Sequence, residues 1–247
     1  MKKPIGKLSL IFLLAVILFP IIAANRIVEA GTNTTLVDNM KKKSRQFFTM
    51  KDANGKPYTV YIFSNNEKKK VTSKDHTWAG ASEGDIWYTG DYQMALQDKS
   101  LITLQTQSVK GYEFNYTRKM IYVIPSKSVG QPDILSFSTT ECSNCREARM
   151  YYIKNGQIEK VKVKTDGEMS DRLFYTEKPK VVSKNLYQSV TLTNAEDIGA
   201  HFNTYSFNPE NGVMTLTKTK SYLGYYADAK WRSIYDKWRS DPNYIVK

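Results

Sequence analysis

Only two cysteines occur in this chain, and both lie in the stretch Glu141-Cys142-Ser143-Asn144-Cys145. Two thiols at this spacing can form a redox pair, supply half of a metal site, or form a structural disulfide. A thioredoxin-type pair needs its first cysteine at the N-terminus of a helix, where the helix dipole makes the thiolate reactive. The conformation of the residues after Cys145 therefore decides which chemistry is available.

The residues after Cys145 favour a strand over a helix. Only nine residues separate Cys145 from Asn155-Gly156, and they include Tyr151, Tyr152 and Ile153. Asn-Gly between β-branched and aromatic residues is a strong hairpin signal, because a two-residue type I′ loop needs positive φ at both positions. We therefore predict a meander, with strands over residues 133–140, 146–153 and 157–163.

In this meander the cysteines share one tight connection, where an oxidising compartment usually bonds them. Closing so short a loop stabilises the fold by only about 2 kcal/mol, so the disulfide would shape a rigid tip. Arg146 and Arg149 follow it and make the tip a candidate binding surface. A thiol-disulfide or other cysteine-dependent enzyme centred on Cys142 and Cys145 is the enzymatic alternative.

The sequence does not favour a zinc site or a Ser-His-Asp catalytic triad. The two histidines, His76 and His201, are far apart in the sequence, and neither has the spacing of a zinc motif. Ser-His-Asp catalysis would also have to use one of these two histidines. We therefore expect no metal, no cofactor and no catalytic residue.

The N-terminus has the pattern of an export signal. Lys2, Lys3 and Lys7 precede a long apolar run over residues 8–23, and Val28-Glu29-Ala30 offers a cleavage site. Residues 1–30 are therefore predicted to be a signal peptide, or an uncleaved anchor that spans the membrane with residues 8–23. In either case we expect the rest of the chain to be secreted or extracytoplasmic.

The charge of the chain indicates its class of partner. Lys and Arg number 36 against 24 Asp and Glu, which gives a formal net charge of +12. A basic exported protein attracts anionic polymers of the cell envelope and membrane surfaces. The lysines are dispersed along the chain, which argues against a concentrated nucleic-acid footprint.

The C-terminal region has helical periodicity over residues 226–242. Trp231, Tyr235 and Trp238 recur at i, i+4 and i+7, and the cations between them make a second candidate binding surface: Lys230, Trp231, Arg232, Tyr235, Lys237, Trp238 and Arg239. The aromatic face can pack on a sheet, or it can dock on a membrane interface or a partner protein. A shorter helix is predicted over residues 194–202, because Asn194 precedes acidic residues.

Most of the remaining sequence alternates apolar and polar residues between turn signals. We predict a mainly β fold, as an antiparallel sandwich, open barrel or meander, with a C-terminal amphipathic helix. Residues 31–50 are predicted to be a tether or short helix, and residues 51–247 a single β-rich domain. The expected function is that of an exported, non-catalytic binding or interaction protein of the cell envelope. An accessory protein that docks through its C-terminal helix is the second alternative.

Overall fold

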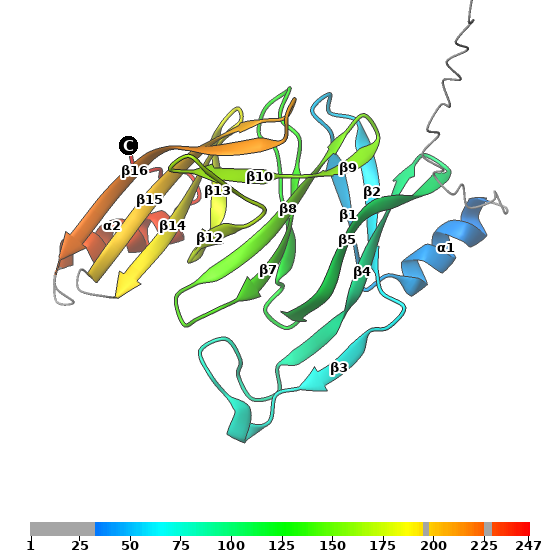
Figure 1. Cartoon of the computed structure of the whole chain (residues 1–247), viewed down its shortest axis with the longest axis horizontal. Helices are drawn as coiled ribbons and strands as arrows, with labels where there is room; N and C mark the ends of the chain where they lie inside the picture. Colours follow the sequence, from blue (N-terminus) through cyan, green and yellow to red (C-terminus); the bar gives the residue numbers. More distant parts are fainter. Residues whose placement is uncertain (1–32, 195–197, 225–228) are drawn as a thin grey trace, which may run out of the picture.

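The computed structural model describes residues 33–194, 198–224 and 229–247, and the predicted signal segment lies outside them (Figure 1). Within these ranges, sixteen strands form three sheets that lie side by side along the longest axis of the molecule (Figure 1). The predicted mainly β, antiparallel fold is confirmed, and the described strands do not close into a barrel.

The first sheet has the order β1-β2-β4-β3, with β5 also paired to β4. A tight turn joins its first two strands, where the Asp52 carboxylate accepts hydrogen bonds from the amides of Asn54 and Lys56 and Gly55 has a φ of +80°. Asn54-Gly55 is a typical turn sequence, because glycine adopts a positive φ without strain. The strands are β1 (Gln46–Lys51), β2 (Pro57–Phe63), β3 (Lys68–Val71), β4 (Ile86–Asp98) and β5 (Leu101–Asn115).

The second sheet contains the predicted meander, except that the third predicted strand, over residues 157–163, ends at Lys160, and a separate strand from Lys162 belongs to the third sheet. The middle strand of the meander pairs with the strands on either side in the sequence, and Asn155 and Gly156 have φ values of 50° and 72° at the predicted turn. The order is β12-β8-β7-β6, and β9 also pairs with β8. The strands are β6 (Ile121–Ile124), β7 (Ile134–Thr140), β8 (Arg146–Lys154), β9 (Gln157–Lys160) and β12 (Leu173–Tyr175).

The third sheet has the order β11-β10-β16-β15-β14-β13, and the pairing of β10 with β16 is its parallel exception. The helix predicted over residues 194–202 is wrong, because β15 begins at Ile198 and pairs with strands on both sides. Ala200 and Phe202 are fully buried there, so sheet packing overrides the helix-start signal. Residues 195–197 lie outside the described ranges. The strands are β10 (Lys162–Thr165), β11 (Glu168–Ser170), β13 (Glu177–Ser183), β14 (Leu186–Asn194), β15 (Ile198–Asn208) and β16 (Val213–Gly224).

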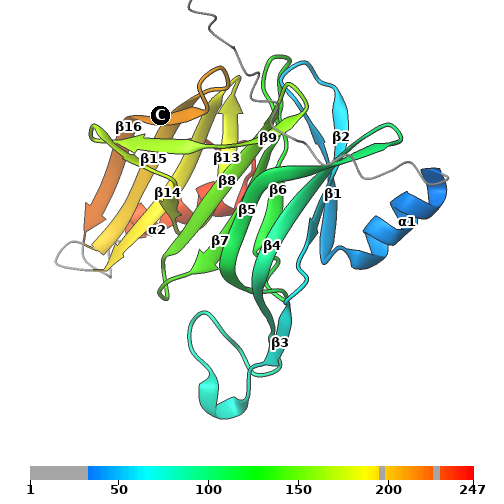
Figure 2. The same cartoon turned by 45° about the vertical axis from the view of Figure 1, so that its right-hand side comes forward.

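Two helices flank the sheets. Helix α1 (Asn33–Lys43) packs Leu36, Val37 and Met40 against the first sheet, and β1 begins three residues after it. The predicted segment 31–50 therefore divides into a helix and most of a strand. Helix α2 (Ala229–Ser240) covers one face of the third sheet (Figures 1 and 2). In the described ranges, neither helix has the length and apolar character needed to cross a membrane.

The aromatic stripe of α2 packs on the third sheet, which confirms the first of the two predicted roles. Trp231, Tyr235 and Trp238 are buried in a cluster that includes Phe202. The Trp238 indole donates a hydrogen bond of 2.9 Å to the side-chain oxygen of Gln188, which also accepts the amide of Val246 at 3.0 Å. A single buried amide therefore joins the helix, the sheet and the C-terminal residues.

Replacing Trp238 with alanine should destabilise the fold strongly. The substitution removes a fully buried indole and leaves Gln188 without one of its donors, so we expect a loss of about 3–5 kcal/mol in the free energy of unfolding. Denaturant-induced unfolding measures this loss. Ser233→Ala, at an exposed position of the same helix, is the control, and equal stability of the two variants would contradict the packing role of α2.

Candidate functional site

Cys142 and Cys145 lie at the tip of the β7–β8 connection. They are at disulfide distance, with their Cα atoms 4.9 Å apart, and the amide of Glu141 donates to the carbonyl of Cys145 at 3.0 Å. The residues after Cys145 enter strand β8 directly. The predicted extended backbone is confirmed, and neither sulfur has the helix dipole that activates a thioredoxin-type thiol.

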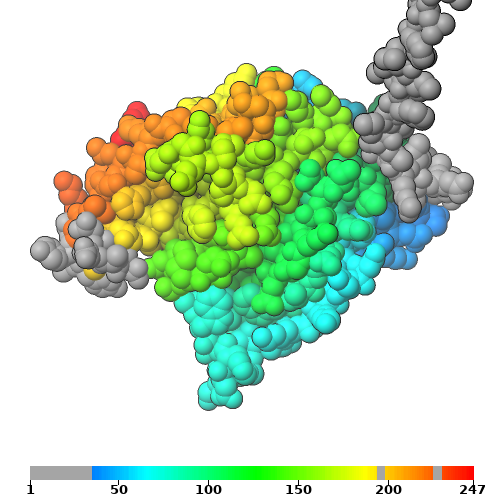
Figure 3. Space-filling model, in the orientation of Figure 1, coloured from blue at the N-terminus to red at the C-terminus, as the bar shows by residue number. Residues whose placement is uncertain are grey.

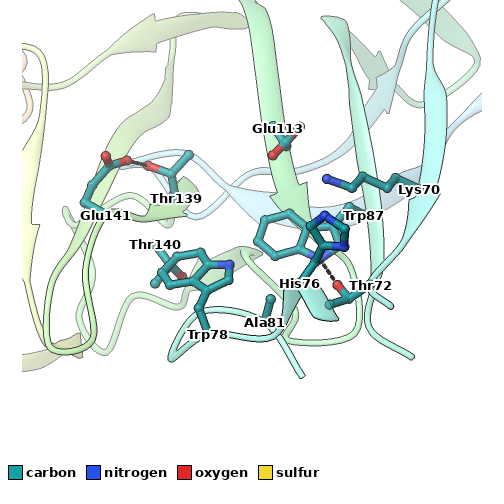
Figure 4. Close-up of a pocket in the computed structure, with 10 residues that line it drawn as sticks. All are labelled: Lys70, Thr72, His76, Trp78, Ala81, Trp87, Glu113, Thr139, Thr140 and Glu141. Atoms are coloured by element: carbon teal, nitrogen blue, oxygen red, sulfur yellow. Dashed lines mark hydrogen bonds between the residues drawn. The ribbon is translucent and has the colours of Figure 1, made fainter. Parts of the chain in front are cut away.

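A cleft lies beside this tip, between the end of β7 and the segment that connects β3 to β4 (Figure 4). We call it the Trp78 cleft; its volume is about 240 Å³. The connecting segment, residues 72–85, includes a short 3-10 helix, Lys74–His76, and projects from the body of the molecule (Figures 2 and 3). The cleft is lined by Lys70, Thr72, His76, Trp78, Ala81, Trp87, Glu113, Thr139, Thr140 and Glu141.

A partly buried ionic network holds the projecting segment to the first sheet. The Asp85 carboxylate accepts hydrogen bonds from Asn115 at 2.6 Å and from the Arg118 guanidinium at 3.1 Å. Arg118 also donates to the carbonyl of Ala79 at 2.8 Å and to the hydroxyl of Ser82 at 3.0 Å. Because these bonds cross from the segment to residues at and just beyond the end of β5, the segment is fixed at both its middle and its end.

The same network sets the charge state of Asp85. Burial by itself would raise the pKa of this carboxyl, but hydrogen bonds from Ser82, Asn115 and Arg118 outweigh burial and lower the pKa below its ordinary value of 3.8. The carboxylate is therefore ionised under all but strongly acidic conditions.

Trp78 is held on the surface of this segment. Its backbone exchanges two hydrogen bonds with Ala81, at 2.9 and 2.8 Å, and its side chain is 45% exposed. The indole lies directly against Gly80, where an added Cβ would come within 2.1 Å of the ring. Glycine at position 80 is therefore required for this placement of the ring.

A second cleft, of about 320 Å³, lies where the second sheet meets α2 and the edge of the third sheet; we call it the cationic cleft. Five cations and one carboxylate line it, a formal charge of +4, and its walls carry three aromatic rings. Its lining residues are Arg118, Met120, Tyr122, Arg146, Tyr175, Glu177, Lys178, Lys180, Trp238 and Arg239.

Two of the five cations have carboxylate partners, and a third is held at the end of helix α2. Arg118 pairs with Asp85, and Arg239 lies 3.6 Å from the carboxylate of Glu177. Lys180 donates to the carbonyls of Trp238 and Asp241 at the C-terminal end of α2, where a cation favourably meets the helix dipole. These three side chains therefore stabilise the fold through contacts within the protein.

The other two cations, Lys178 and Arg146, have only neutral acceptors. Lys178 lies 3.5 Å from the carbonyl of Lys119 and 4.1 Å from the ring centre of Tyr122, while Arg146 donates to the carbonyl of Thr176. Across the described parts of the chain, neither has a carboxylate within 4.0 Å. Burial lowers the pKa of Lys178, and the charges of Arg146 and Lys119 lower it further. A bound anion would relieve this repulsion.

The predicted site residues are distributed over different surfaces. Arg146 joins Trp238 and Arg239 in the cationic cleft, whereas Arg149 lies three residues along β8 and therefore on the opposite face of the sheet. On α2, Trp231 and Tyr235 are buried, and the Tyr235 hydroxyl donates to Glu177 at 2.7 Å. The remaining cations of the helix point elsewhere: Lys237 lies over Tyr244, Arg232 is near the Trp231 ring, and Lys230 is exposed.

Lys178 and Lys180 were not among the predicted site residues, although the sequence contains a signal for them. They flank Pro179 in Lys178-Pro179-Lys180, and alternate residues of a strand share one face. Arg118 had no comparable local signal, because only the tertiary fold brings it to this place.

Comparison with known proteins adds no homologue. No family model matches the sequence, and neither the curated proteins nor the solved structures include a significant match. In the described residues, no group of three or more His, Cys, Asp and Glu side chains is placed to hold a metal ion.

Removing the Cys142–Cys145 disulfide should change the stability of the fold only slightly. The closed loop is very short, so Cys142→Ser combined with Cys145→Ser should reduce the free energy of unfolding by no more than about 2 kcal/mol. Chemical denaturation of the double variant measures this change, with the reduced wild-type chain as its control. A variant that cannot fold would show that the bond supports the domain.

Removing the charge of Asp85 should destabilise the projecting segment. At neutral pH we expect Asp85→Asn to cost about 1–3 kcal/mol, because Arg118 loses its ionised partner. The pKa of Asp85 is lowered in the fold, so its contribution is complete above the unfolded value of about 3.9 and disappears as the pH falls through the lowered pKa. Unfolding of both chains from pH 7 to pH 2 tests this. A difference that stays constant with pH would contradict it.

Proposed function

We propose that the protein is an exported, non-catalytic binding protein of the cell envelope, and that it takes an anionic group of an envelope polymer into the cationic cleft. The observation that carries this proposal is the close placement of Lys178 and Arg146 without a carboxylate partner of their own. A phosphate or carboxylate there would accept charge-assisted hydrogen bonds from both side chains.

The energetics of the empty cleft favour an anion over a neutral ligand. Arg146 is partly buried, whereas Lys178 is exposed overall. Partial burial of the Lys178 amine and, after it, the charge of Arg146 lower the pKa of Lys178. An anion that binds between them replaces this repulsion with attraction. The half-buried ring of Tyr122 adds apolar contact area for the remainder of the ligand, whereas Tyr175 and Trp238 are fully buried behind the cleft wall.

Other features of the chain agree with an extracytoplasmic role. The basic n-region and the apolar run over residues 8–23 support export, and the net charge of +12 supports attraction to anionic surfaces. The strand conformation after Cys145 makes a thioredoxin-like activity the weaker alternative. The buried aromatic stripe of α2 weakens the alternative in which the helix docks on a membrane, because that face is already covered.

Neutralising Lys178 should reduce the affinity for anionic polymer. Loss of one hydrogen bond to a charged group costs about 1.5–3 kcal/mol, so we expect Lys178→Met to bind soluble poly(glycerol phosphate) roughly 10- to 100-fold more weakly. Lys218→Met removes the same charge from an exposed position on β16 and is the matched control. Calorimetric titration of the full chain at fixed ionic strength measures both affinities.

The pH dependence provides a second readout of the same experiment. An anion favours the charged form of Lys178, so the affinity of the wild-type chain should fall as the pH rises through the lowered pKa, below 10.5. Lys178→Met should lack this component. Equal loss of binding in both lysine variants would indicate a general charge effect, and binding to anionic phospholipid vesicles but to no polymer would assign the ligand to the membrane surface instead.

A further inference from the structure

The Trp78 cleft differs from the cationic cleft in the sign of its charge. Two carboxylates, Glu113 and Glu141, line it together with a single lysine, Lys70, so its formal charge is −1 with His76 neutral. This local excess of acid occurs in a chain of net charge +12. A ligand selected by the cationic cleft would meet repulsion here, so the two clefts suit different chemical groups.

The cleft also contains a prearranged aromatic surface. An isolated exposed tryptophan needs no explanation by itself. The backbone of Trp78, however, is held by two hydrogen bonds to Ala81 and by the Asp85–Arg118 network that fixes its segment, and the ring packs on Gly80. Because this backbone is already fixed, a ligand that stacks on the ring orders less of the protein, which favours binding.

Hydroxyl and carboxylate groups surround the ring on the other sides. Thr139, Thr140 and Glu141 approach from the end of β7, and Glu113 approaches from β5 (Figure 4). The Thr139 hydroxyl already donates to the Glu141 carboxylate at 2.6 Å, and such an oxygen can accept a further hydrogen bond. Trp87 adds a second indole, which a hydrogen bond of 2.8 Å to Thr72 fixes in place.

These features together describe a ligand with one apolar face and a polar edge. The volume of about 240 Å³ is below the range of roughly 300–1,000 Å³ that drug-sized ligands occupy, so the cleft accepts a single ring-sized unit. A pyranose ring has a face of C–H groups that can stack on an indole and hydroxyls at its edge that donate to carboxylates. The carboxylates disfavour a sugar that carries its own negative charge.

We propose that the Trp78 cleft binds one neutral or amino hexopyranose unit of a saccharide, stacked on Trp78 and hydrogen-bonded at its edge to Glu113 and Glu141. This site is separate from the cationic cleft, and its occupation does not depend on the function proposed above. The disulfide-linked tip bears directly on it, because Glu141 precedes Cys142.

Titration of the full chain with defined saccharides tests this proposal. Oligosaccharides of glucose, N-acetylglucosamine and glucosamine are compared with an oligouronate and with choline, in buffer free of glycoside detergents. Binding is measured by calorimetry and by tryptophan fluorescence. We expect at least one neutral or amino saccharide to bind and the oligouronate to bind at least tenfold more weakly.

Two variants locate the site. Trp78→Ala removes the stacking ring and should weaken saccharide binding at least tenfold. Gly80→Ala keeps the ring but displaces it, because the new Cβ would overlap the indole, and it should weaken binding similarly. Phe174→Ala removes an aromatic ring that is 54% exposed on β12, outside this cleft, and should leave the affinity unchanged.

Several outcomes would overturn the proposal. They are binding of no saccharide in the panel, unchanged binding by Trp78→Ala, and binding of choline alone, which would indicate an aromatic site for a cation. Lys178→Met should retain saccharide binding. A chain that binds saccharide but no anionic polymer would therefore reject only the function of the cationic cleft, and the reverse result would reject only this site.

Discussion

Strand β8 is the constraint on which the rest of the fold depends. It pairs with β7, β9 and β12, and both of its faces are buried. Tyr151 and Ile153 belong to the core that the first and second sheets share, whereas Ala148, Met150 and Tyr152 belong to the core shared with the third sheet. Successive side chains of β8 therefore point alternately into two different hydrophobic cores. This arrangement requires the backbone to remain extended from Arg146 onward.

That requirement also determines the character of both clefts. Because β8 starts immediately after Cys145, the cysteine tip is confined to a short connection, and Glu141 lies at the edge of the Trp78 cleft. Arg146, the first residue of the strand, faces the cationic cleft beside Lys178. Elements of one hairpin thus contribute to a site of negative charge and to a site of positive charge, on a chain whose composition alone suggests a uniformly basic surface.

Short sequence patterns predicted many of the strands, turns and helices, but they predicted few of the residues that line either cleft. Asn155-Gly156 predicted its turn because few sequences tolerate positive φ at two successive positions. The spacing of Trp231, Tyr235 and Trp238 predicted the buried face of α2. The signal at Asn194 failed because pairing of β15 on both sides outweighs a helix start of one or two turns. The clefts combine residues from separate sheets, and no periodicity in the sequence brings such residues together.

Arg118 lines one cleft and supports the other. Its guanidinium lines the cationic cleft, while its hydrogen bonds to Ala79, Ser82 and Asp85 support the segment that carries Trp78. An anion that drew this side chain toward itself would weaken the support of the tryptophan. By thermodynamic reciprocity, a ligand that stabilised the tryptophan segment would oppose the anion by the same factor. One arginine thus gives the molecule a physical route for competition between two chemically unlike ligands that never touch.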